Sequence, residues 1–339
     1  SGSLVARQFD TGKLRFIGEP EPVGESILQL GPNHLFDFGS AANIVTYQTV
    51  DPNLPFAWFD RSGKKISTIG EPGRYQRIEI SPDGSHAAFE KLNLDGRNEN
   101  IWSIDLVRGI AARLTTGPSS DYGPVWSRDG RTLWFSSTRD GMDHIYEVPV
   151  SRVADVREIK ALKEATLDVW SSSPDGHLVY EAQQRDGKPD LWTLSPGSKR
   201  DAAPFRATSA GETEAQFSPD GKWVAFSSDD TGRQEVYVRS FADPSTEVQV
   251  STDGGFRPRW RRDGRELFFW NKSATLTAVP VSTDSQFHAG APVPLFSLPV
   301  WVDYDVAADG QRFLILTTAE NAEPAGVAVV NWMEGLRKP

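Results

Sequence analysis

Charged and aromatic residues recur at one place in this sequence, within eight residues before an Asp-Gly pair. Side chains of opposite charge beside aromatic rings are what a binding site for a small molecule or a peptide needs. Either these residues contact a ligand, or their charges pair with one another and are solvated in a water-filled channel. The candidate ligand-binding residues are Arg77, Glu79, Asp121, Tyr122, Asp168, Glu214, Arg257, Arg259, Trp301, Asp303, Tyr304 and Asp305.

The sequence lacks the usual catalytic motifs. It has no G-x-S-x-G motif, no S-x-x-K motif with its partner motifs and no glycine-rich phosphate loop. It has no cysteine, and its five histidines form no metal-binding pair of the H-x-x-x-H kind. We therefore predict no catalytic residue, no metal and no cofactor; a divalent metal such as calcium in a channel is the open alternative.

A repeat positions these candidate residues. Six Asp-Gly pairs follow one another at intervals of 43 to 46 residues. One interval before the first pair, LFDFGSAANIVTYQT around Asp37 resembles a degenerate copy without the dipeptide. A period in the mid-forties with several short strands is typical of propeller blades, and seven such units would nearly fill the chain of 339 residues. The six pairs begin at Asp83, Asp129, Asp175, Asp220, Asp263 and Asp309.

One unit shows the expected blade. Residues 214–217 form an inner strand, and Ser-Pro-Asp-Gly at 218–221 forms a tight turn in which Gly takes the left-handed conformation. Residues 223–227, 235–239 and 247–250 form the next three strands. The second strands are apolar on both faces, which indicates burial on both sides. We expect the turns to serve the fold, and the residues before them to lie at the mouth of a central channel.

The fold class that follows is all-β. We predict a single domain over residues 1–339, a seven-bladed β-propeller of four-stranded antiparallel blades, with six or eight blades as alternatives. The early segments LVARQFD and LRFIGEPEPV are expected to pair with C-terminal strands, because such pairing closes the ring and removes an open sheet edge.

Charge and hydropathy exclude two classes of partner. The net charge is −10 without a cluster of Lys and Arg, so we expect no nucleic-acid partner. No run approaches the roughly 18 apolar residues of a membrane span, so we expect no direct membrane insertion of this segment. The absence of cysteine suits an oxidising compartment.

Several quoted segments resemble known repeats. FSPDGKWVAFSSDDTGRQEVYVRSF, RPRWRRDGRELFF, YDVAADGQRFLIL and VVNWMEGL resemble TolB-like β-propeller repeats. They are most similar to the C-terminal extracytoplasmic propeller of bacterial serine/threonine protein kinases of the acidobacterial type. WFDRSGKK and IGEPEPV fit the same pattern, so the resemblance covers nearly the whole chain.

The resemblance implies a non-catalytic sensor domain in signal transduction, located in the periplasm or at the cell surface. Its partner would be an unidentified protein, peptide or small molecule at the channel mouth. The chain would then be a fragment of a larger membrane-anchored protein or a stand-alone relative, because it contains no kinase motif. Three alternatives stay open: a metal-dependent lyase or hydrolase built in the channel, the gating propeller of a prolyl-oligopeptidase-like peptidase, and a purely structural protein-interaction hub.

Overall fold

All the secondary structure of the described residues is β-strand. The computed structural model describes residues 53–93, 98–153, 155–161, 165–184, 187–197, 200–283, 286–298 and 302–317, and outside them the strands β1–β6 and β32. Among these described residues, no helix is long and apolar enough to cross a membrane.

The chain divides into two compact units. One comprises Ser1–Leu54 with Thr317–Pro339, and the other comprises Pro55–Leu316. In the first unit, strands pair in the order β1-β2-β6-β32, β5 pairs with β6, and β3 pairs with β4. The strands are β1 (Gly2–Asp10), β2 (Arg15–Ile27), β3 (Gln29–Leu30), β4 (Leu35–Phe36), β5 (Phe38–Ala41), β6 (Ile44–Thr49) and β32 (Ala325–Val330). This division is based on contacts and not on folding, so the single domain over residues 1–339 stays a prediction.

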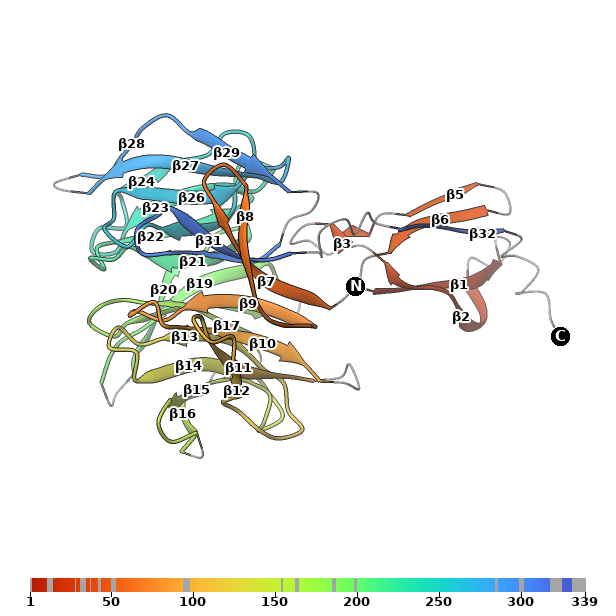
Figure 1. Cartoon of the computed structure of the whole chain (residues 1–339), viewed down its shortest axis with the longest axis horizontal. Coiled ribbons are helices and arrows are strands. Elements are labelled where there is room, and N and C mark those ends of the chain that lie inside the picture. Colours follow the sequence, from red (N-terminus) through yellow and green to blue (C-terminus); the bar gives the residue numbers. More distant parts are fainter. Residues whose placement is uncertain are drawn as a thin grey trace. The chain divides into compact units, whose positions relative to one another are not determined.

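The second unit is a six-bladed β-propeller (Figure 1). Each blade is named here by its innermost strand. The β9 blade consists of β9 (Tyr75–Ile80), β10 (His86–Leu92), β11 (Glu99–Asp105) and β12 (Ala111–Arg113), and the β13 blade of β13 (Asp121–Trp126), β14 (Thr132–Ser137), β15 (His144–Pro149) and β16 (Arg157–Ala161). The β17 blade consists of β17 (Ala165–Ser172), β18 (Leu178–Gln184), β19 (Pro189–Leu194) and β20 (Ala202–Arg206).

The remaining blades complete the ring. The β21 blade consists of β21 (Glu212–Phe217), β22 (Trp223–Ser228), β23 (Glu235–Ser240) and β24 (Glu247–Gln249). The β25 blade consists of β25 (Phe256–Trp260), β26 (Glu266–Trp270), β27 (Thr275–Ser282) and β29 (Val293–Ser297), with β28 (His288–Ala289) also on β27. The β30 blade consists of β30 (Tyr304–Val306), β31 (Arg312–Leu316), β7 (Leu54–Asp60) and β8 (Lys65–Gly73).

The blade count corrects the first prediction. The all-β propeller is confirmed, but it has six blades, the stated alternative, and not seven. The segment predicted as a seventh unit supplies β4, β5 and β6, of which β6 pairs with both β5 and β32, and β4 pairs with β3. Without an Asp-Gly turn, the spacing alone could not distinguish another blade from strands that pair elsewhere.

Early and late strands close the ring, as expected, but the strands are not the predicted ones. β31 pairs with β7 in antiparallel register from Arg312 with Asp60 to Leu316 with Phe56 (Figure 1). The predicted strand LVARQFD instead lies in β1, which pairs with β2. The strand that closes the ring is therefore Leu54–Asp60 and not the predicted segment near residue 5.

The turns adopt the predicted backbone. Gly221 has φ of 74°, and its N–H donates to the carbonyl of Ser218 over 2.8 Å. The Asp220 carboxylate accepts hydrogen bonds from Ser218 Oγ at 2.6 Å and from Lys222 N at 3.1 Å. The aspartate is thus a local acceptor that fixes the turn, which is the Asx-turn role.

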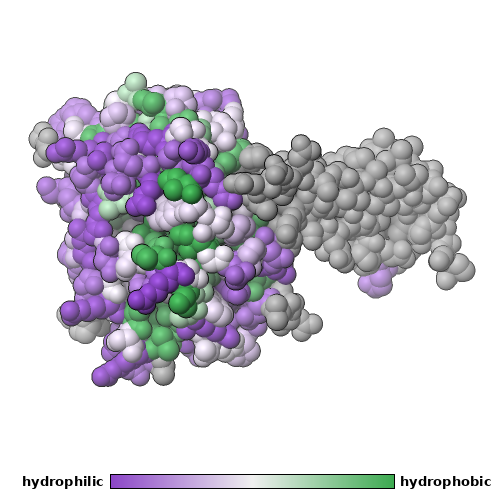
Figure 2. Space-filling model, viewed as in Figure 1, coloured by the Kyte–Doolittle hydropathy of each residue, from purple (hydrophilic) through white to green (hydrophobic). Residues whose placement is uncertain are grey.

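The core lies between the blades. One cluster joins Phe268 and Trp270 of β26 to Phe313 and Ile315 of β31, and Ala57 of β7 belongs to it. The whole of β22 is buried, as its apolar character on both faces predicted. Hydrophilic residues cover most of the visible propeller face, and hydrophobic residues lie between them in small groups (Figure 2).

Candidate functional site

The inner strands place charged residues at one repeated position. Counting back seven residues from each turn glycine gives Arg77, Gly123, Val169, Glu214, Arg257 and Asp303. At this position β9, β13, β21 and β25 carry a bulge, and their residues have positive φ: 41° for Arg77, 64° for Gly123, 59° for Glu214 and 52° for Arg257. A side chain in this conformation costs about 1–2 kcal/mol relative to glycine. Three charged residues therefore occupy a position at which glycine would be less strained.

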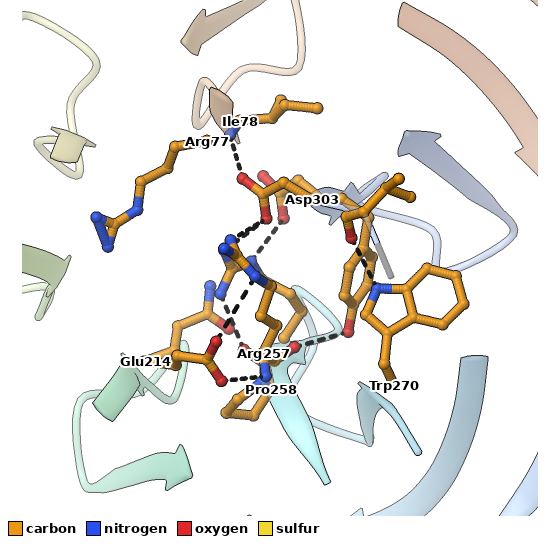
Figure 3. Close-up of polar contacts among 12 residues, drawn as sticks. Arg77, Ile78, Glu214, Arg257, Pro258, Trp270 and Asp303 are labelled. Atoms are coloured by element: carbon orange, nitrogen blue, oxygen red, sulfur yellow. Dashed lines mark hydrogen bonds and ion pairs between the residues drawn. The ribbon is translucent and has the colours of Figure 1, made fainter. Parts of the chain in front are cut away.

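Five of the predicted residues form one ion-pair cluster: Arg257 pairs with Glu214 and Asp303 (Figure 3), and Arg259 pairs with Asp303 and Asp305. Arg257 Nη1 lies 2.7 Å from the Asp303 carboxylate, and its Nε lies 3.6 Å from Glu214. Arg257 N also donates to Glu214 over 2.7 Å, and Asp303 accepts a hydrogen bond from Ile78 N at 2.6 Å. Burial alone would raise the pKa of Asp303, but Arg257, Arg259 and Arg77 outweigh it and hold that pKa below its usual value. The cluster therefore ties β21, β25, β30 and β9 together.

A second row of residues, five before each turn glycine, joins neighbouring blades. In four blades this side chain accepts a hydrogen bond from a backbone N–H of the next blade, so these residues secure the ring. The pairs are Glu79 with Trp126 (2.9 Å), Ser171 with Phe217 (3.1 Å), Gln216 with Trp260 (2.7 Å) and Asp305 with Ile80 (2.6 Å).

Two carboxyls of this row have unusual acidity. Burial, aided by the charge of Asp305, raises the pKa of Glu79 to about 8. Burial also raises the pKa of Asp305 to about 6, although Arg259, whose Nε lies 3.9 Å away, opposes the shift. Glu79 is therefore mostly neutral at pH 7.

Arg77 points away from the ion-pair cluster (Figure 3). Its Nη1 lies 2.6 Å from Asp168, and its guanidinium stacks on the Trp170 ring at 3.4 Å from the centroid. Its Nη2 is buried and has no hydrogen-bond partner among the residues that the structure describes. Such an atom requires an explanation, because buried donors are nearly always paired.

Carboxyls outnumber cations around Arg77. We define the strand-start cluster as Arg77 with Glu90, Glu99, Asp168 and Glu181, at the end where the inner strands begin. Burial is the main cause that raises the pKa of all four carboxyls, to about 8 for Glu90 and Glu181. Glu99 and Asp168 also repel each other, and Asp168 repels Glu181. Arg77 and, for Asp168, Arg257 oppose these shifts, but the pKa values of the carboxyls stay raised.

The other predicted residues lie elsewhere. Asp121 is buried and accepts hydrogen bonds from Ser137 Oγ at 2.5 Å and Arg139 Nη2 at 2.8 Å within the β13 blade, and from Asn100 Nδ2 of the β9 blade at 3.4 Å. Tyr122 donates to Asp143 over 2.6 Å, and Tyr304 donates to the carbonyl of Arg257 over 2.9 Å. Trp301 lies outside the described residues.

Sequence reasoning missed Trp170, Glu90, Glu99 and Glu181. Glu90 and Glu181 each follow the apolar run of a second strand, HAAF or LVY. An acidic residue directly after an apolar run, inside a strand whose neighbours are buried, was the available signal. Glu90 accepts a hydrogen bond from Gly123 N of the next blade at 2.7 Å.

One group in the described part of the chain has the composition of a metal site. Asp140, His144 and Glu158 of the β13 blade bring their ligand atoms within 4.8 Å of one another. None of the three is a predicted site residue or a member of the strand-start cluster. The absence of a metal and a cofactor stays a prediction.

Known proteins resemble parts of this sequence, although no family model matches it. An uncharacterized protein of Agrobacterium fabrum is 32% identical over 33% of this chain and 38% of its own length. The peptidase YuxL of Bacillus subtilis, itself uncharacterized, is 25% identical over 47% of this chain and 31% of its own. The Tol-Pal system protein TolB of Francisella tularensis is 27% identical over 51% of this chain and 40% of its own. The chain thus spans less than half the length of these relatives.

Solved structures share the fold. A protein assigned to TolB in Agrobacterium tumefaciens superposes with a TM-score of 0.61 and 16% identity, over 79% of this chain and 98% of that one. TolB of Acinetobacter baumannii gives 0.57 and 14%, over 94% and 79%. An oligogalacturonate lyase in complex with manganese gives 0.53 and 17%, over 88% and 81%.

The resemblance to TolB is therefore supported at two levels. The fold is shared over most of this chain, and sequence similarity extends over about half of it. The link to kinase-attached propellers is not shown and stays a prediction. The chain is a β-propeller of the TolB-like kind in fold, with partial sequence similarity to TolB itself.

Proposed function

We propose that this chain is a non-catalytic binding propeller, and that its ligand is a peptide or protein segment with a basic side chain. The ligand would dock at the channel end where the inner strands begin. The observation that carries the proposal is the strand-start cluster, in which four carboxyls with raised pKa values accompany Arg77. Of the predicted contact residues, Arg77 and Asp168 belong to it.

Electrostatics favours a cationic ligand group there. A positive charge near carboxyls with raised pKa values favours their ionised form, so binding would release protons. Partly exposed carboxyls offer access: the Asp168 side chain is 25% exposed.

The setting of this function is part of the proposal. We infer an extracytoplasmic location, in the periplasm or at the cell surface, and a sensor role in signal transduction for the full-length protein. The lack of cysteine and the similarity to TolB support this inference.

The test is selection from a random peptide library, followed by calorimetry with the selected peptides. Peptides rich in Lys or Arg are expected, with affinity that rises from pH 6 to pH 8 as the cluster ionises. Glu99→Gln should weaken binding about threefold to tenfold, since a charge-assisted contact is lost. Glu99 has no described ion pair or hydrogen bond, so this variant leaves the fold intact.

The control removes the same charge elsewhere. Asp220→Asn changes an exposed turn carboxylate and should leave peptide affinity unchanged. Selected peptides without basic residues, or equal affinity of wild type and Glu99→Gln, would refute the proposed site.

The enzymatic alternatives have separate tests. A metal-dependent lyase would contain bound metal after purification and would cleave oligogalacturonate, the substrate class in the name of one structural neighbour. A gating propeller would be followed by a peptidase domain, and the chain spans 31% of the peptidase YuxL. We expect neither metal nor lyase activity.

A further inference from the structure

We propose that the opposite end of the propeller axis is a second site, which binds a small organic dicarboxylate between Arg128 and Arg262. This end is formed by the turns that follow the inner strands. The site is distinct from the strand-start cluster and does not depend on the function proposed for it.

A cavity of about 160 Å³ lies there, and every blade contributes to it. For comparison, an engineered protein cavity of about 150 Å³ holds benzene. The cavity therefore has room for a small organic molecule. The residue two before each turn glycine lines it in all six blades: Pro82, Arg128, Pro174, Pro219, Arg262 and Ala308.

The two arginines are available to a ligand. Arg128 and Arg262 are exposed, and neither has an ion pair or hydrogen bond with any residue that the structure describes. The nearby guanidiniums of Arg61 and Arg261 are instead both bound to Glu266. The contrast indicates that Arg128 and Arg262 are not part of the scaffold.

Symmetry favours a ligand with two anionic groups. Arg128 belongs to the β13 blade and Arg262 to the β25 blade, which are three blades apart in a ring of six. The arginines therefore approach the axis from opposite sides. A guanidinium binds a carboxylate through two parallel hydrogen bonds, so a dicarboxylate could engage both at once.

The walls favour an organic anion over an inorganic one. Trp126 and Trp260, from the same two blades as the arginines, line the cavity together with Ile80, Phe217 and Val306. Each indole N–H donates to a backbone carbonyl of the preceding blade, at 3.0 Å for Trp126 and 3.1 Å for Trp260, which fixes the rings. A hydrocarbon segment between two carboxylates would contact these side chains.

Nearby acids do not close the site to an anion. The carboxylates of Asp129 and Asp263, next to the arginines, accept hydrogen bonds from the N–H groups of Arg131 and Arg265 in their own turns. Of the carboxyls that line the cavity, Glu79 has its pKa raised to about 8 by burial and so is mostly neutral at pH 7. Asp305, with its pKa raised by burial to about 6, faces Arg259.

Calorimetry with succinate, glutarate and adipate at pH 7 tests the proposal, with butyrate as the monocarboxylate. We expect at least one dicarboxylate to bind at least about tenfold more tightly than butyrate. Arg128→Gln and Arg262→Gln should each weaken it about tenfold, since each removes a charged hydrogen-bonding partner. Both side chains are exposed, so the variants are expected to fold.

Matched controls lie three residues further along the same turns. Arg131→Gln and Arg265→Gln remove an equal charge outside the cavity and should leave dicarboxylate affinity unchanged. Glu99→Gln should also have no effect, so failure of this site and failure of the peptide site are distinguishable.

Three results would overturn the proposal: no dicarboxylate binding at about 10 mM, butyrate binding as tightly as a dicarboxylate, or equal losses in the control variants. A short peptide that ends in Glu carries the same two carboxylates as glutarate. Tighter binding of the peptide, lost in Arg128→Gln, would identify a chain terminus as the natural source of the dicarboxylate, and tighter binding of glutarate would identify a free acid.

Discussion

Glu79 and Gln216 occupy the same position in two blades and make the same bond to the backbone of the next blade. An amide therefore suffices for this bond, and the carboxyl adds sensitivity to pH. Since burial raises the pKa of Glu79 to about 8 from an ordinary 4.5, the folded protein keeps a proton that the unfolded chain loses between these values. This group therefore makes the free energy of unfolding fall as the pH rises from about 5 to 8.

Glu79→Gln should remove that dependence. Urea unfolding of wild type and variant at pH 5 and pH 8.5 should show the variant gaining stability relative to wild type at the higher pH, by on the order of a few kcal/mol at most. Gln216→Glu is the converse control and should lose more stability at pH 8.5 than at pH 5. A difference between Glu79→Gln and wild type that is the same at both pH values would show that Glu79 is ionised in the folded protein.

At the scale of the strand, the bulge is the feature that aims the candidate side chains. Its left-handed backbone in β9, β21 and β25 carries charged residues, whereas β13 has Gly123 there. These residues were predicted as candidates because they are charged and differ between blades, but the sequence did not indicate their backbone conformation. Bulges depend on pairing between strands, and the local sequence does not reveal them when the residue is not glycine.

The bulge predicts an unusual order of stability for two variants. Arg77→Gly and Arg77→Ala both lose the contacts with Asp168 and Trp170. Only alanine, which has a Cβ atom, is strained by the left-handed backbone conformation. Arg77→Gly should therefore be more stable than Arg77→Ala by about 1 kcal/mol, measured by urea unfolding. The same pair of changes at Thr213, outside the left-handed residues, should favour alanine. If Arg77→Ala were as stable as Arg77→Gly or more stable, residue 77 would not have a strained left-handed backbone.

The turns illustrate a limit of sequence reasoning at this scale. Their Asp and Gly residues serve the fold, as predicted. The residue before Asp, however, lines the axial cavity in every blade, and it is Arg in two of them. This position varies between blades while the Asp and Gly after it do not, so the repeated motif alone did not indicate that it lines a cavity.

At the scale of the whole molecule, the regular spacing of the turns predicted the propeller correctly, because each turn determines where two strands pair. It did not predict the number of blades, because that requires knowing which distant strands close the ring. The predicted site was dispersed for a related reason. Arg257 and Asp303 form an ion pair across two blades, whereas Asp121 forms its ion pair with Arg139 of its own blade.

The six blades consist of strands β7 to β31, which begin at Leu54 and end at Leu316, so none of their strands comes from residues 1–53 or 318–339. A chain limited to residues 53–317 should therefore fold cooperatively, with a melting temperature within a few degrees of the full chain. Circular dichroism and differential scanning calorimetry would measure this. A fragment that stays unfolded, while the full chain melts cooperatively, would show that the first unit is required for the propeller.

The pairing of β31 with β7 has a consequence for synthesis on the ribosome. Phe56 and Asp60 find their partners in a segment made about 250 residues later. At 5 to 20 residues per second, the edge of β7 stays exposed for roughly 10 to 50 seconds in each newly made chain. An unpaired strand edge is where chains aggregate. The period of greatest risk for this protein is therefore the interval before its last blade emerges, and a chaperone that covers Leu54–Asp60 during that interval would raise the yield of folded propeller.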